Sequence, residues 1–199
     1  VCLVLDHHSN IDPIGNALLN CTNWESNKLF YESILDLAQA NTSCVFIIRG
    51  KNNSWRNIPA FKEIEQFLVD SPNIILDNRY DIKDRSYILA AMADVVVARY
   101  TSLCDQCLAN GIPVLVFEPW ANGEPIIAKW HDYIPYPILV NSIRELHIRF
   151  SSLIQNEEYM PKSLFKKMRR EYYAVDKNEA SPAQIITNIT NELIKKGNL

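Results

Sequence analysis

Runs of consecutive apolar residues alternate with stretches of helical periodicity along the chain. The apolar runs predict strands at residues 1–6, 44–49, 73–76, 94–98, 113–117 and 138–140. Apolar residues spaced by three and four predict helices at 27–40, 58–69, 84–92 and 101–110, and three more between about 142 and 196, broken near Pro161 and Pro182. In the helix at 58–69, we expect Ile64, Phe67 and Leu68 to share one side. Because strands that are apolar throughout are buried on both faces, the pattern predicts a doubly wound α/β domain with a parallel sheet.

The predicted strands also set the expected organisation of the chain. We expect residues 1–154 to form the sheet domain and residues 155–199 a helical extension that packs on it. Val1 opens a predicted buried strand, so we expect the chain to be a piece of a longer protein. Two long polar loops, 10–27 and 119–137, follow predicted strands. In open α/β sheets the ligand binds beyond the carboxyl ends of the strands, so both loops are candidates for the site.

Composition excludes several classes of protein. The 199 residues are 48% hydrophobic and 22% charged, with a net charge of −3, which excludes disorder and disfavours a nucleic-acid partner. Gly-x-Gly does not occur, so the dinucleotide fingerprint and the Walker loop are excluded. Five irregularly spaced cysteines indicate a reducing compartment. With no apolar run near the ~20 residues of a membrane span, we expect a cytoplasmic protein.

The segment 98–116 carries the clearest chemistry. Thr101 and Ser102 follow a predicted strand and begin a helix, Gly111 closes the helix, and Pro113 enters the next strand. A hydroxyl at a helix start caps the first N–H groups, and the exposed N–H groups and helix dipole there favour an anion. The segment therefore fits a phosphate site, and it also fits an ordinary capped helix.

This segment resembles the donor-binding half of GT-B glycosyltransferases. In that superfamily a Thr-Ser or Ser-Ser pair starts a helix, an acidic residue lies near its end, and Gly-x-Pro-Val opens the next strand. Here the acidic position falls on Gln106, with Asp105 one residue earlier. The stretches 77–80, 87–97 and 46–51 are similar to the segments around this motif. The resemblance covers residues 1–154.

Within the superfamily the chain is most similar to bacterial envelope polysaccharide enzymes, namely capsule and lipopolysaccharide transferases that use CMP-Kdo and CDP-glycerol polymerases. The resemblance implies the donor half of a metal-independent glycosyltransferase that uses no cofactor. Such an enzyme moves a sugar from a CMP-, CDP- or UDP-linked donor to a growing envelope polysaccharide. The acceptor site would lie on an N-terminal domain of the same protein.

The resemblance also assigns residues. Arg49 and Lys51 would neutralise the leaving phosphate in catalysis, and Thr101, Ser102 and Arg99 would bind the donor phosphate. Asn78 and Tyr80 would contact the base, and Gln106 and Glu118 would bind ribose or sugar hydroxyls. For each basic residue, a surface salt bridge is the alternative interpretation.

Three further features keep alternatives open. His7 and Asn10 follow the first strand and are candidates for contact with the acceptor or the phosphate. His7 and His8 are adjacent, and this spacing disfavours a zinc site. The alternative interpretation is a buried structural histidine. Cys104 and Cys107 fit core positions better than a metal or redox site. The basic stretch 162–170 fits either peripheral contact with the inner-membrane surface or a solvated helix packed by its apolar side.

Two other functions fit the same sequence. A nucleotide-sugar 2-epimerase is built on the same fold, and only the part of the protein outside this chain would separate it from a transferase. A flavodoxin-like interaction domain without catalysis is the second alternative. The acidic cluster and lysine of a receiver domain do not occur at the predicted strand ends.

Overall fold

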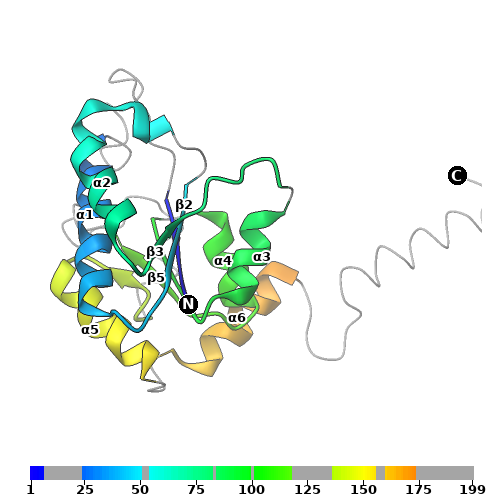
Figure 1. Cartoon of the computed structure of the whole chain (residues 1–199). Helices are drawn as coiled ribbons and strands as arrows, with labels where there is room; N and C mark the ends of the chain where they lie inside the picture. Colours follow the sequence, from blue (N-terminus) through cyan, green and yellow to red (C-terminus); the bar gives the residue numbers. More distant parts are fainter. Residues whose placement is uncertain are drawn as a thin grey trace, which may run out of the picture.

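Six parallel strands form one sheet with helices on both faces, which confirms the predicted fold class (Figure 1). The computed structural model describes residues 1–6, 24–50, 54–82, 84–99, 101–117, 136–155 and 160–173. The strands are β1 (Cys2–Leu5), β2 (Phe46–Arg49), β3 (Ile74–Leu76), β4 (Val95–Ala98), β5 (Val114–Phe117) and β6 (Leu139–Val140). The helices are α1 (Trp24–Ala40), α2 (Lys62–Asp70), α3 (Arg85–Met92), α4 (Ser102–Ala109), α5 (Ile143–Ile154) and α6 (Lys162–Tyr173), with 3-10 turns η2 (Ser54–Asn57) and η3 (Pro59–Phe61).

The strand order places a topological switch point in the middle of the sheet. The order is β3-β2-β1-β4-β5-β6, so the chain builds outward from β1 in one direction and then in the other. Leu3 of β1 pairs with Ile47 of β2 on one side and with Val96 of β4 on the other. A crevice for ligands forms at the carboxyl ends of strands where the order reverses, which here is between β1 and β4.

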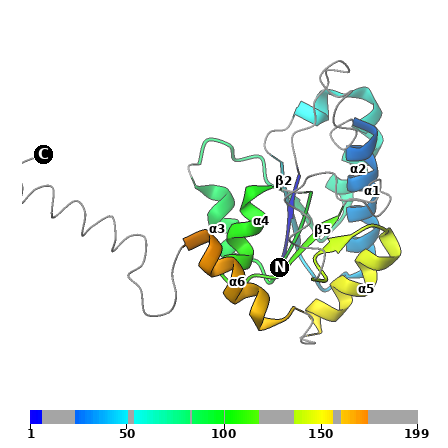
Figure 2. The same ribbon diagram turned by 180° about the vertical axis from the view of Figure 1, so that it is seen from behind.

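The helices divide between the two faces of the sheet. Helices α1, α2 and α5 cover one face, and α3, α4 and α6 cover the other (Figures 1 and 2). Phe46 of β2 stacks on Phe150 of α5 with 5.5 Å between ring centroids, so Phe46 faces the α5 side. Every residue of β1, β4 and β5 is buried, as expected for strands covered on both faces.

Two details differ from the predicted elements. The helix expected at 58–69 begins instead as the turn η3, with Pro59 in its first position, and α2 starts at Lys62. Phe67 was expected to share a side with Ile64 and Leu68, which are buried, but Phe67 is 50% exposed. The two buried residues are four apart and face the sheet, and Phe67 lies away from that stripe. The expected helix beyond Pro182 lies outside the described residues, as do most of the loops 10–27 and 119–137.

Helix α6 packs against α4. Its apolar residues Leu164 and Met168 are buried, as in the interpretation of a helix packed by its apolar side. Among the helices that the structure describes, none has the length and hydropathy of a membrane span.

Candidate functional site

Four charged side chains lie at the carboxyl ends of the four neighbouring strands β1 to β4. Asp6 follows β1, Arg49 ends β2, Asp77 follows β3 and Arg99 follows β4. None of the four is more than 8% exposed. Charged side chains this deeply buried are rare and require partners, so the four residues make this edge of the sheet a candidate functional site.

Arg49 is held in place by three contacts. Its Nη1 donates to Asp77 Oδ2 at 2.6 Å and to the backbone carbonyl of Arg79 at 3.3 Å, and its Nε donates to Ser86 Oγ at 2.7 Å. Tyr80 covers the guanidinium, whose central carbon lies 5.2 Å from the ring centroid. The orientation of Arg49 is therefore fixed by the loop after β3 and by α3 together.

Asp77 is the centre of a cluster of arginines. Besides Arg49, its carboxylate accepts from Arg85 Nε at 3.0 Å and from Arg79 Nε at 3.3 Å. Arg85 begins α3, whereas the side chain of Arg79 is 61% exposed. Three guanidinium groups thus surround one carboxylate, which leaves the neighbourhood of Asp77 with excess positive charge.

Asp6 and Tyr31 connect this cluster to the core. The Tyr31 hydroxyl donates to Asp6 Oδ2 at 2.7 Å, and both groups are buried. Burial raises the pKa of Tyr31 well above its usual 10.0, and the adjacent Asp6 carboxylate raises this pKa further. The Tyr31 ring is fixed by Trp55, with 4.5 Å between centroids, and by Phe61. Asp6 is thereby oriented by a rigid aromatic group from α1.

Tyr80 lies on the outer side of the cluster. Tyr80 is 36% exposed, and its ring covers the guanidinium of Arg49. Partial burial raises the pKa of the Tyr80 hydroxyl, the Arg49 charge opposes this rise, and Asp77 and Asp6 add to it. Tyr80 is therefore a neutral phenol at physiological pH, and its ring is an aromatic surface at the edge of the site.

The start of α4 is capped as the sequence predicts. Thr101 has extended backbone angles, and its Oγ1 accepts from the N–H of Leu103 at 3.1 Å. Ser102 is the first helical residue, and Asp105 in the first turn is fully buried. The other N–H groups of the first turn and the helix dipole make this helix start favourable for an anion.

The end of α4 follows a Schellman motif. Gly111 donates to the carbonyl of Leu108 at 3.0 Å, and Ile112 donates to that of Cys107 at 2.9 Å. Gly111 has φ +81°, a left-handed conformation that glycine adopts at low cost. The motif fixes the angle at which the chain leaves α4 for β5.

The two cysteines of α4 are core residues. Cys104 and Cys107 are 0% and 2% exposed. Burial raises the pKa of Cys104 to about 12 and that of Cys107 to about 11, so both thiols are protonated at neutral pH. Among the described residues, no group of three or more His, Cys, Asp or Glu side chains could hold a metal ion.

The structure brings part of the predicted site together. Arg49, Arg99, Tyr80 and Thr101, with Ser102, are grouped at the carboxyl edge by the strand order and register. Asn78 lies in the loop between Asp77 and Tyr80, and Gln106 is a half-buried residue of α4. Four other predicted site residues lie outside the described part of the chain: His7, Asn10, Lys51 and Glu118.

Sequence reasoning missed the residues that hold the site together. Asp77 directly follows a predicted strand, which is a signal that would have placed it at the same edge as Arg49. Arg85 and Ser86 open α3, and Tyr31 lies within α1. Their roles depend on which strands are neighbours, and local periodicity does not carry that information.

Comparison with solved structures relates the fold to known proteins. No protein-family model and no curated protein sequence matches the chain. A protein from Listeria monocytogenes assigned as a UDP-N-acetylglucosamine 2-epimerase matches with a TM-score of 0.52 and 13% sequence identity, over 89% of this chain and 47% of its own. S. aureus MnaA, solved with UDP, matches with a TM-score of 0.50 and 13% identity, over 90% of this chain and 47% of its own. The chain therefore has a Rossmann-like α/β fold, which it shares with these GT-B-like structures, and it spans about half of their length.

Proposed function

We propose that this chain is the donor-nucleotide-binding half of a metal-independent GT-B glycosyltransferase of cell-envelope polysaccharide synthesis. The observation that carries the proposal is the arginine cluster at the carboxyl edge of the sheet, where Arg49, Arg79 and Arg85 surround Asp77. Arg99 and the capped start of α4 belong to the same edge. Positive charge at the carboxyl edge of an open α/β sheet, together with a helix N-terminus at the same edge, is suited to a nucleotide phosphate.

Transfer of a sugar from a nucleotide-sugar requires positive charge beside the departing phosphate. When a nucleotide-sugar transfers its sugar, the bond from the anomeric carbon to the phosphate oxygen breaks, and negative charge grows on the departing phosphate. Oriented cations and N–H groups stabilise that charge most when they need no reorientation during the reaction. Arg49 meets this condition because Asp77 and Ser86 already fix its guanidinium. In this proposal Arg49 and Lys51 act on the leaving group, and Arg99, Thr101 and Ser102 bind the donor phosphate.

The remaining roles follow from position. Tyr80 offers a half-exposed ring beside Arg49, suited to stacking on a base, with Asn78 next to it. Gln106 and Glu118 would take ribose or sugar hydroxyls, and His7 and Asn10 would meet the phosphate or the acceptor. The acceptor would bind an N-terminal domain of the same cytoplasmic protein, because the chain spans 47% of each matched structure. No nucleic-acid partner and no cofactor is proposed.

A nucleotide-sugar 2-epimerase is the second candidate. The structure from Listeria monocytogenes favours it, because that protein is assigned as a UDP-N-acetylglucosamine 2-epimerase. Both functions require a nucleotide at the carboxyl edge, so the identity of the nucleotide helps to separate them. Preference for CMP or CDP would favour the transferase, whereas preference for UDP fits both functions.

The test is calorimetric titration and thermal melting of the chain with CMP, CDP, UDP and GDP, with and without magnesium. We expect one nucleotide to bind without magnesium and to raise the melting temperature. Ser102→Ala removes a hydroxyl that would donate to the phosphate, and Arg49→Lys removes the forked guanidinium. Each variant should therefore weaken nucleotide binding about tenfold. Arg169→Gln, on the exposed side of α6, is the matched control and should leave binding unchanged. Failure of all four nucleotides to bind, or equal loss in the control, would contradict the proposal.

A further inference from the structure

Arg79 differs in exposure from the other two arginines that surround Asp77. The side chain of Arg79 is 61% exposed, whereas that of Arg85 is 14% exposed and that of Arg49 is 8% exposed. Tyr80 also covers the guanidinium of Arg49. Of the three cations, Arg79 is therefore the most accessible to a ligand that arrives from solvent.

The backbone of Arg79 is fixed although its side chain is exposed. Its carbonyl accepts from Arg49 Nη1 at 3.3 Å. The N–H of Tyr80 donates to the carbonyl of Asn78 at 3.1 Å, so the chain turns tightly with Arg79 at the centre of the turn. The N–H of Asp77 donates to a carbonyl of β2 at 2.9 Å and ties the start of the loop to the sheet. An exposed guanidinium is thus carried on a backbone that the sheet holds in place.

The guanidinium of Arg79 keeps most of its hydrogen-bonding capacity. It contacts Asp77 through Nε, with 3.3 Å to Oδ1. In the described part of the chain, neither Nη group of Arg79 forms a hydrogen bond or an ion pair, and the loop acids Asp81 and Asp84 do not contact it. The two Nη groups can therefore donate to a pair of oxygens on one ligand, as phosphate presents them.

Asp77 keeps its charge balance when Arg79 moves away. Its carboxylate accepts from Arg49 Nη1 at 2.6 Å and from Arg85 Nε at 3.0 Å, and both distances are shorter than the 3.3 Å to Arg79 Nε. The buried carboxylate thus retains two cationic partners without Arg79. Because the Arg79 end of the contact is exposed, solvent replaces this ion pair at small cost. Asp77 therefore holds Arg79 at the edge of the site only weakly.

We propose that Arg79 is the residue that captures the donor phosphate as it arrives at the carboxyl edge of the sheet. Its guanidinium leaves Asp77 and donates to the phosphate oxygens, while Arg49 and Arg85 keep Asp77 in place. Arg49 is then also a positioning residue for Arg79, because it holds the carbonyl of Arg79 and the carboxylate of Asp77. The inference rests on the proposed function and deepens it, since it identifies the cation of the cluster that the nucleotide contacts first.

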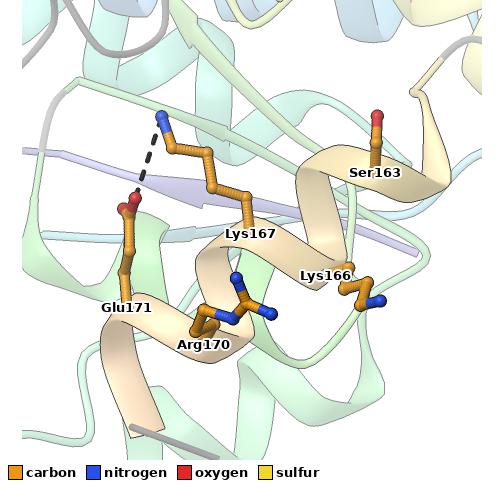
Figure 3. A pocket seen from close by; sticks show the side chains of 5 residues that line it. All are labelled: Ser163, Lys166, Lys167, Arg170 and Glu171. Atoms are coloured by element: carbon orange, nitrogen blue, oxygen red, sulfur yellow. Dashed lines mark ion pairs between the residues drawn. The ribbon is translucent and has the colours of Figure 1, made fainter. Parts of the chain in front are cut away.

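A second basic surface has to be distinguished from this site. On α6, Ser163, Lys166, Lys167, Arg170 and Glu171 line a hollow of about 340 Å³ (Figure 3). Lys167 turns toward Glu171, with 3.8 Å between Nζ and Oε1, and Lys166 points away from that pair (Figure 3). Helix α6 packs on α4 and lies toward the end of the sheet where β1 begins (Figure 1). Lys166→Gln thus removes one exposed cation at a different place and is the matched control.

The experiment is calorimetric titration of the chain with inorganic pyrophosphate and with CMP, CDP, UDP and GDP, at low and high salt. Arg79→Gln should weaken the binding of pyrophosphate and of the preferred nucleotide about tenfold, and make both less dependent on salt, because one charged contact is lost. Arg79→Lys keeps the charge without the fork and should bind with intermediate affinity. Lys166→Gln should bind as the parent chain does.

Thermal melting separates binding from a structural role of Arg79. The melting temperature of Arg79→Gln without ligand should match that of the parent chain, because Asp77 keeps Arg49 and Arg85. A clearly lower melting temperature, with affinity unchanged, would make Arg79 a structural residue and overturn the inference. Equal loss of affinity in Lys166→Gln would overturn it too, because the ligand would then respond to net charge alone.

The titrations also separate this inference from the proposed function. Nucleotide binding that Arg79→Gln leaves unchanged would overturn the inference, and the proposed function would stand. Pyrophosphate binding that Arg79→Gln weakens, with no nucleotide bound by the parent chain, would support Arg79 as the anion-binding residue and contradict the nucleotide function. A parent chain that binds neither pyrophosphate nor any nucleotide would contradict both.

Discussion

Arg49 ends β2 and Asp77 follows the neighbouring strand β3, and their side chains form a buried ion pair with 2.6 Å between Nη1 and Oδ2. The pair joins β2 to the loop after β3 at the carboxyl edge of the sheet. Arg85 and Arg79 bind the same carboxylate. Asp77 is therefore the positioning residue on which the orientation of several cations depends.

Asp77→Asn should destabilise the fold strongly. The variant keeps the shape of the side chain but leaves buried Arg49 without its counter-charge, and breaking one partner of a buried pair costs about 3–5 kcal/mol. Urea unfolding measures the loss. The control is Glu171→Gln, whose ion pair with Lys167 is exposed and should contribute at most about 1 kcal/mol. Similar losses in the two variants would show that Asp77 is not the centre of the cluster.

The two residues at the start of α4 should separate stability from binding. Thr101→Ala removes the cap on the Leu103 N–H and should cost about 1 kcal/mol, while Thr101→Ser should restore it. Ser102 is not the capping residue, so Ser102→Ala should reduce nucleotide affinity more than stability. Paired urea unfolding and calorimetric titration measure both quantities. Loss of stability in Ser102→Ala equal to that in Thr101→Ala would contradict this division of roles.

Gly111→Ala should destabilise the chain through its backbone alone. No atom lies within 4 Å of an added Cβ, so the cost comes from the left-handed φ of +81° and should be about 1 kcal/mol. Gly111→Asn should cost less, because asparagine tolerates this conformation better than alanine. Urea unfolding compares the two variants with the parent chain. A larger loss for asparagine than for alanine would point to crowding and contradict the conformational explanation.

Stability should fall at alkaline pH. Burial raises the pKa of Cys104 to about 12 and that of Cys107 to about 11, from 9.0. Between pH 9 and these values the unfolded chain releases protons that the folded chain keeps, so the free energy of unfolding decreases by about 1.4 kcal/mol per pH unit for each thiol. Denaturant unfolding from pH 8 to 11 measures this slope. Cys104→Ala should make the slope shallower, and an unchanged slope would contradict the assignment.

The sequence was sufficient to predict the strands and most helices, but not which strands are neighbours in the sheet. Continuous apolar runs predicted the six strands of the sheet, because an apolar run is a signal that the local sequence carries. The pairing of Cys2 with Val95 joins residues far apart in the chain and has no local signal. The prediction that Phe67 shares the buried side of α2 was wrong for a related reason, because the position of β3 decides which face of α2 is buried.

The candidate site likewise contains residues that the local sequence identifies and residues that only the folded structure identifies. Arg49, Arg99, Thr101 and Ser102 could be selected because strand ends and helix starts are recognisable along the chain. Tyr31 could not, because its contact with Asp6 exists only once α1 packs beside β1 and positions the hydroxyl. The partners that fix a functional side chain are thus set by tertiary structure, and the functional side chain itself by local sequence.

The central position of β1 has a consequence for folding during synthesis. Strand β1 is made before the other strands of the sheet, yet the register places it between β2 and β4, so its second neighbour is complete only when residues 95–98 have been made. Until then one edge of β1, a strand of apolar residues, lacks its native neighbour. Pairing between residues that are far apart in the chain slows folding. A nascent chain that stops before Val95 is therefore the form of this protein most exposed to aggregation and to capture by chaperones.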